Sequence, residues 1–308
     1  MVLDTAPTRH HLITKSVKDI LGAADRAEPK LRRAILDALE ALQGSATDLE
    51  RLVASGRLEP IAAAIERTFL PRDLVIEIIN ASSGPAVATA GVAAAPFNMA
   101  FNQVNQRAIR WAEQNAAKLV TGHVDKALIR RIVTRGTTEG IHPRLTAKLL
   151  RDIIPIFDNH QDIVDRVYQA AINAGVTPEQ AGKVAAKKSA RYAKYRAEMV
   201  ARTEAMRAAN MGQQLAWETA IDLDLLPTGT KKIWLATGDD RTCKICAPMD
   251  GKTVAVVGEF TIDRQATSFT RSGSDFKVAG TKPYKGWGPQ PTPPAHPKCR
   301  CTLILEPL

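Results

Sequence analysis

The sequence predicts an α+β fold, with mainly helical N-terminal and central regions and a small β-rich module at the C-terminus. Apolar residues recur at spacings of three and four over most of residues 14–222, which is typical of amphipathic helices. After Pro227 the pattern changes to short β-branched runs and proline-rich segments, and all four cysteines lie there. Aromatic residues make up only 5% of the 308 residues, which favours helices packed through small side chains.

Interruptions of the helical spacing divide the chain into four regions: an N-terminal helical region at 1–79, an Ala/Gly/Pro-rich linker or arm at 80–97, a basic helical domain at 98–226 and a cysteine-rich module at 227–308. In the first region, Pro29 is expected to begin a new helix and Gly44 to end it. The second region is small, uncharged and interrupted by proline and glycine. We expect either a flexible linker or an extended arm that a partner surface covers.

The net charge of +10 is unevenly distributed along the chain. Residues 101–210 hold 19 Lys and Arg against 10 Asp and Glu, whereas the two flanking segments are close to balance. Such asymmetry favours a polyanionic partner, most often nucleic acid, although a solvated basic helix face is the alternative.

The most informative helix is expected at about 178–222, with Thr177 as its N-cap and Pro178 at the first helical position. Its early turns carry many basic residues against a single acidic one, Glu179. A helix of this kind can follow a phosphate backbone without reading the base sequence. The candidate nucleic-acid-binding residues are Lys183, Lys187, Lys188, Arg191, Lys194 and Arg196.

The cysteines form two clusters, a Cys-x2-Cys pair and a later His-Pro-Lys-Cys-Arg-Cys run. Two such clusters are the usual pattern of a structural zinc site, in which four ligands form a tetrahedron. Two disulfides and unliganded thiols are the alternatives. A catalytic zinc is disfavoured, because the loop between the clusters offers only Glu259 as a glutamate base. The expected Zn²⁺ ligands are Cys243, Cys246, Cys299 and Cys301, with His296 as a substitute for one of the last two.

Three short strands are expected in the module: Lys232-Ile-Trp-Leu-Ala before the first cysteine pair, Thr253-Val-Ala-Val-Val after it, and Cys301-Thr-Leu-Ile-Leu at the end. Residues 258–280 show only a weak pattern. Gly251 suits a chain reversal beside a metal. Arg202 lies on the apolar stripe of the long helix, so it should be paired, and we expect Asp239 or Asp240 as its partner. The alternative is that Arg202 reaches solvent.

The run from Trp234 to Gly251 (WLATGDDRTCKICAPMDG), followed by Pro-Ala-His-Pro-Lys-Cys-Arg-Cys, resembles the C-terminal signature of the phage Mu F-like family, the minor capsid or head morphogenesis proteins of tailed bacteriophages. The upstream Ala-Arg-Thr-Glu-Ala run and Asn210 resemble the helix that precedes this signature. The resemblance covers about 200–301, and more loosely reaches back to Asn102. The structural positions that it singles out are Arg202, Glu204, Trp234, Asp240 and Gly251.

The resemblance implies a minor head protein of the virion, located at the portal vertex and the capsid interior and assembled in the host cytoplasm. Its expected partners are the portal or major capsid protein and non-specifically bound double-stranded DNA. No membrane, small-molecule substrate or catalytic residue is expected. The alternatives are a cellular zinc-containing nucleic-acid-binding protein and a metal-dependent hydrolase or nuclease. Compact finger spacing and a recognition helix would favour the first alternative, and a carboxylate–histidine constellation the second.

Overall fold

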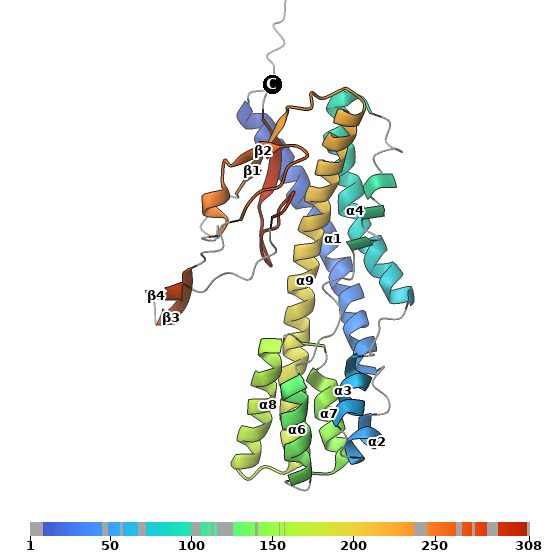
Figure 1. The fold of residues 1–308 in the computed structure, drawn as a ribbon, viewed down its shortest axis with the longest axis vertical. Helices are drawn as coiled ribbons and strands as arrows, with labels where there is room; N and C mark the ends of the chain where they lie inside the picture. Colours follow the sequence, from blue (N-terminus) through green and yellow to red (C-terminus); the bar gives the residue numbers. More distant parts are fainter. Residues whose placement is uncertain are drawn as a thin grey trace, which may run out of the picture. The chain divides into compact units, whose positions relative to one another are not determined.

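The computed structural model describes residues 9–44, 49–55, 58–66, 72–99, 106–108, 110–111, 114–115, 126–138, 141–153, 155–156, 158–236, 245–262, 267–272, 275–281 and 289–306. These residues are mainly helical with a small antiparallel sheet near the C-terminus, which confirms the predicted α+β class (Figure 1). The helices are α1 (Arg9–Gly44), α2 (Leu49–Ala54), α3 (Leu58–Glu66), α4 (Arg72–Ala94), α6 (Lys126–Thr138), α7 (Pro143–Ile153), α8 (Asp158–Asn173) and α9 (Pro178–Asp222), with 3-10 turns η1 (Ala95–Phe97) and η2 (Ala247–Met249).

The chain forms two compact units, each built from segments that are distant in sequence. The first unit contains Met1–Pro29, Ile79–Asn115 and Ala201–Leu308. The second unit contains Lys30–Ile78 and Ala116–Val200. The long helices α1, α4 and α9 therefore contribute to both units, and the units do not follow the four regions expected from the sequence.

In the second unit, short amphipathic helices pack through one apolar face each. Helix α2 packs against α7 and α3, and α6 packs against α3, α7 and α8. Arg131 and Arg135 of α6 form ion pairs with Asp162 and Asp165 of α8. The N-terminal half of α9 joins this unit through Ser189, whose hydroxyl donates a hydrogen bond to the Asp152 carbonyl.

In the first unit, the second half of α4 approaches α9 at a point where both helices carry small residues. A Cβ atom added to Gly212 of α9 would lie 2.0 Å from the Ala86 carbonyl oxygen and 2.6 Å from the Thr89 hydroxyl. Thr89 also donates a hydrogen bond to the Ala209 carbonyl at 2.6 Å. Backbones approach this closely only where one side has no Cβ, so Gly212 sets the spacing of the two helices.

The linker or extended arm expected at 80–97 is helical, as part of α4 and η1. Alanine, the residue that dominates this segment, has the highest helix propensity, and its small side chain suits close packing on α9. The segment Asp73–Phe97 is long and apolar enough to cross a membrane by length and composition, a test that core helices also pass. The prediction that a new helix begins at Pro29 is wrong, because α1 continues through this proline to Gly44.

The sheet of the first unit has strand order β2-β1-β5, with β1 (Lys231–Leu235), β2 (Thr253–Ala255) and β5 (Thr302–Leu305) all antiparallel. These are the three strands that the sequence predicts, with β2 shorter than expected. Trp234 of β1 pairs with Leu303 of β5, and both side chains are buried with Phe260 in the core of this unit. The hairpin of β3 (Thr267–Ser272) and β4 (Asp275–Thr281) lies in the segment whose sequence pattern was weak.

Candidate metal centre

Three cysteines from the two distant clusters converge in the first unit. The sulfurs of Cys246, Cys299 and Cys301 all lie within 4.8 Å of one another, and all three side chains are buried. The Cys246 and Cys299 sulfurs are 3.5 Å apart, which is too far for a disulfide bond between them. The sequence spacing therefore predicted correctly that the two clusters meet. Cys243 and Asp240 lie outside the described residues.

His296 places a nitrogen beside the same sulfurs. Its Nε2 atom lies 3.1 Å from the Cys246 sulfur, and its Nδ1 atom lies 2.8 Å from the Pro297 carbonyl oxygen. A carbonyl oxygen only accepts hydrogen bonds, so Nδ1 carries the proton in the neutral ring. Nε2 then turns its lone pair toward the cysteines, which is the arrangement that a metal-ligating histidine needs.

The backbone around each cluster is a tight turn. The Cys299 N–H donates to the His296 carbonyl at 3.1 Å, and Lys298 within this turn has a φ of +61°. Cys246 begins a second turn, in which the Met249 N–H donates to the Cys246 carbonyl at 3.0 Å. Gly251 follows with a φ of +76°, and its N–H donates to the Trp234 carbonyl of β1. Gly251 therefore lies in the left-handed conformation at a chain reversal between β1 and β2.

The cluster stabilises negative charge on one sulfur. Hydrogen bonds from the Cys246 and Cys301 thiols hold the pKa of Cys299 well below its usual value, and His296 lowers it further. The contact with Cys246 also lowers the pKa of Cys301, but the Cys299 sulfur and burial outweigh that contact and leave the pKa raised. In the absence of a cation, a second thiolate is disfavoured beside the first, because like charges repel in a buried site.

The donor set fits a tetrahedral metal ion. Ligands about 2.3 Å from a zinc ion lie about 3.8 Å apart at the corners of a tetrahedron. The observed separations of 3.5 Å between two sulfurs and 3.1 Å between sulfur and nitrogen are close to this value. Soft thiolates with one imidazole are ligands that zinc prefers. The three cysteines therefore supply three donors that lie close together, and His296 places a nitrogen beside one of them, Cys246, as a candidate fourth donor.

The other residues singled out in the sequence lie around this centre or along α9. Trp234 is fully buried and meets Phe260 edge-on at 5.2 Å between ring centroids. Arg202 is paired, as expected, but its partners are Asp25 and Glu28 of α1 at 3.2 and 2.7 Å. The partners expected for it, Asp239 and Asp240, lie outside the described residues. Glu204 is buried and pairs with Arg207 at 3.3 Å on the same helix.

A comparison with protein-family models matches residues 161–304 to the family described as Phage Mu protein F like protein. Residues 161–304 are therefore similar to the Phage Mu F-like family. The matched range contains α9, the three-stranded sheet except the last residue of β5, and the candidate metal donors that the structure describes. No curated protein and no solved structure matches the chain. This similarity supports a phage head-related protein.

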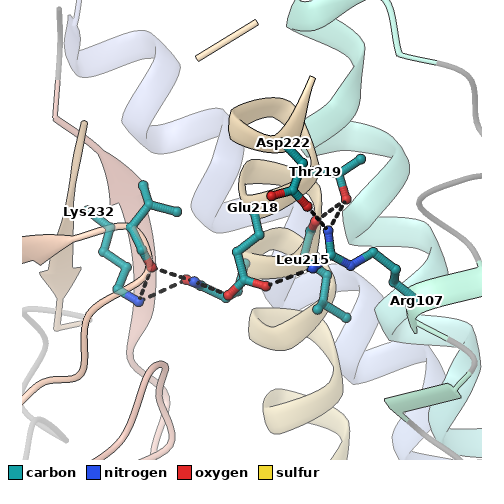
Figure 2. A network of polar contacts seen from close by, with 8 residues as sticks. Arg107, Leu215, Glu218, Thr219, Asp222 and Lys232 are labelled. Carbon is teal, nitrogen blue, oxygen red and sulfur yellow. Dashed lines mark hydrogen bonds and ion pairs between the residues drawn. The ribbon is translucent and has the colours of Figure 1, made fainter. Parts of the chain in front are cut away.

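A buried polar network that the sequence did not reveal connects the Phage Mu F-like region to Arg107 (Figure 2). Lys232 of β1 is fully buried and donates to the Gln214 side chain at 3.0 Å and to the Val256 carbonyl at 2.7 Å. Gln214 donates to Glu218 at 2.7 Å, and Glu218 pairs with Arg107. A lysine in an amphipathic strand is normally expected at the surface, so sequence alone gave no signal for this burial.

Burial lowers the pKa of Lys232 to about 8, against the opposing effect of Glu218 and Glu259. Glu259, the one residue considered as a base for a catalytic zinc, is thus close enough to Lys232 to influence its charge. On the other side of the helix, Arg107 also bonds Thr219 and Asp222 at 3.0 and 2.8 Å. The network therefore connects the sheet, α9 and the helical segment around residue 107 within one unit.

The basic residues of the N-terminal half of α9 divide into two groups. Those with exposed side chains are Lys183, Lys187, Arg191 and Lys194. Lys188 is half-buried, with its ammonium 5.1 Å from the centre of the Tyr192 ring, and Tyr192 stacks on His160. Arg196 is only 4% exposed, so its predicted role as a phosphate contact is wrong. Helix period explains this, because residue 196 returns to the face that buries Ala185 and Ser189.

Proposed function

We propose that this protein is a minor head protein of a bacteriophage, in which a structural zinc ion fixes the C-terminal module on α9 and the basic face of α9 contacts packaged DNA. The observation that carries the proposal is the convergence of three buried cysteines and His296 within the Phage Mu F-like region. The role is architectural, and no group in this proposal performs catalysis. The partners are the portal or the major capsid protein, on the capsid interior.

A structural role for the ion follows from the burial of its donors. The thiols are 2–3% exposed, and four donors fill the coordination sphere of zinc, which leaves no position for a reacting water. The three strands β1, β2 and β5 are short, and two of the donors lie immediately before β5. An ion that joins residue 246 to residues 296–301 would close this module in the way that zinc closes small domains.

Metal analysis of the purified protein tests the centre. We expect about one zinc per chain in the wild type, and loss of the zinc together with a lower melting temperature in Cys301→Ser. Thr302→Ser is the matched control, because Thr302 is equally buried beside the cluster but offers no soft donor. Equal zinc content in the wild type and Cys301→Ser would contradict the proposed centre.

Location in the head is tested separately. The tagged protein should co-purify with phage heads and with the isolated portal ring. Association with the tail alone would overturn the placement. Nuclease activity that disappears in His296→Ala would contradict the non-catalytic role.

A further inference from the structure

The loop that carries most of the metal donors has an unusual backbone. Residues 296–299 form a turn in which Pro297 is the second residue and Lys298 the third. With a φ of +61°, Lys298 adopts the left-handed conformation that glycine normally occupies at this place in such a turn. The turn brings His296 and Cys299 to the same metal, so something outside the turn must hold this conformation.

Two buried side chains of α9 hold the two ends of this loop. The Thr203 hydroxyl accepts a hydrogen bond from the Lys298 N–H at 3.0 Å, and Thr203 is 1% exposed. The Asn210 side-chain amide donates to the Cys301 carbonyl at 3.1 Å, and Asn210 is fully buried. Positions 203 and 210 are two helical turns apart, so both side chains project from one face of α9.

We infer that Thr203 and Asn210 are positioning residues of the metal centre, which fix the loop so that His296, Cys299 and Cys301 meet at one ion. This inference rests on the proposed zinc centre. Neither residue touches the ion. Each holds a backbone group that is adjacent to a ligand, as outer-shell partners do in metal sites. Metal binding and attachment of the loop to α9 then strengthen each other by the same factor.

The coupling can be measured on the full-length protein by titration with Co²⁺ alone, followed by the absorption of cobalt–thiolate bonds. Thr203→Val keeps the shape of the side chain and removes the hydroxyl. We expect it to weaken Co²⁺ binding by about 10- to 100-fold, the usual effect of losing an outer-shell partner. Thr203→Ser restores the hydroxyl and should restore the affinity.

Asn210→Ser gives an independent variant in case Thr203→Val does not fold. Its hydroxyl can still bond the Met206 carbonyl, which Asn210 contacts at 3.0 Å, but is too short to reach Cys301. The matched control is Thr219→Val, which removes a buried hydroxyl of α9 that bonds Leu215 and Arg107. The control should bind Co²⁺ as the wild type does.

The outcomes separate the two proposals. Absence of cobalt–thiolate absorption in the wild type would defeat the metal centre itself. If the wild type binds and both Thr203→Val and Asn210→Ser bind equally tightly, the positioning role is wrong. An equal loss in Thr219→Val would show that general loosening of α9 is the cause, which also overturns the inference.

Discussion

Lys232 illustrates how a single buried charge responds to its surroundings. The ammonium group is surrounded by uncharged acceptors, Gln214 and Val256, and by the Phe260 ring at 5.6 Å. Because removal from water disfavours the charged form, the pKa falls to about 8 although Glu218 and Glu259 raise it. In the unfolded chain the pKa is about 10.4. At pH values between these two pKa values, Lys232 is mostly protonated in the unfolded state and mostly deprotonated in the folded state.

This difference predicts how stability depends on pH. The unfolding free energy should rise as pH increases from about 8 to about 10.4, by up to about 3 kcal/mol, because the penalty of the buried charge is relieved. Below pH 8 that penalty is fully present. Lys232→Met should lack this rise, whereas Lys231→Met, the exposed neighbour, should keep it. Urea denaturation at pH 7.5 and 9.5 measures the difference, and identical pH dependence in both variants would refute the prediction.

Helix α9 is the element that organises the first unit. One of its faces carries Ala208, Gly212 and Ala216, against which α4 packs. Another face carries the polar side chains Thr203, Asn210 and Gln214, which hold the C-terminal module. Because one face of α9 packs on α4 and another binds the C-terminal module, buried positions on this helix include polar as well as apolar residues. The apolar pattern in the sequence therefore predicted only part of its buried surface.

The close approach of α4 makes the two glycines of α9 respond oppositely to the same change. Gly212→Ala places a methyl group against the Ala86 carbonyl, and we expect it to destabilise the protein by about 3 kcal/mol or more. Gly182→Ala meets nothing within 4 Å and should stabilise the helix by about 0.5–1 kcal/mol. Thermal denaturation of both variants compares them. Equal effects would mean that α4 does not pack on α9 as described.

At the scale of the whole molecule, the charge distribution bears on the proposed contact with DNA. The excess of basic residues lies in residues 101–210, and four of them form an exposed row on α9. Each phosphate contact releases counterions, so binding should be independent of base sequence and should weaken steeply with salt.

The salt dependence tests this interface. In a plot of log K against log salt concentration for a short DNA duplex, the double variant Lys187→Gln with Arg191→Gln should lower the slope by about 2. Arg144→Gln, an exposed arginine on α7, is the control and should leave the slope unchanged. A slope that stays at the wild-type value in the double variant would remove α9 from the interface.

The sequence determined the features that depend on local chemistry. The N-cap at Thr177, the extent of α9, the three strands around the cysteines and the left-handed glycine at position 251 all follow from residue types at fixed offsets. The convergence of the two cysteine clusters could also be predicted. Two cysteine motifs with metal-ligand spacing are expected to bind the same ion, so they must lie close together although they are far apart in the sequence.

Only the tertiary structure decided the features that depend on which helices and strands pack against each other. The alanine-rich segment at 80–97 becomes a helix because α9 offers Gly212 as a closely fitting partner. Lys232 and Arg196 are buried because the faces that carry them are covered, although charged residues normally favour solvent. Arg202 pairs with Asp25 and Glu28 because folding brings α1 beside α9, at a sequence separation that no local pattern encodes.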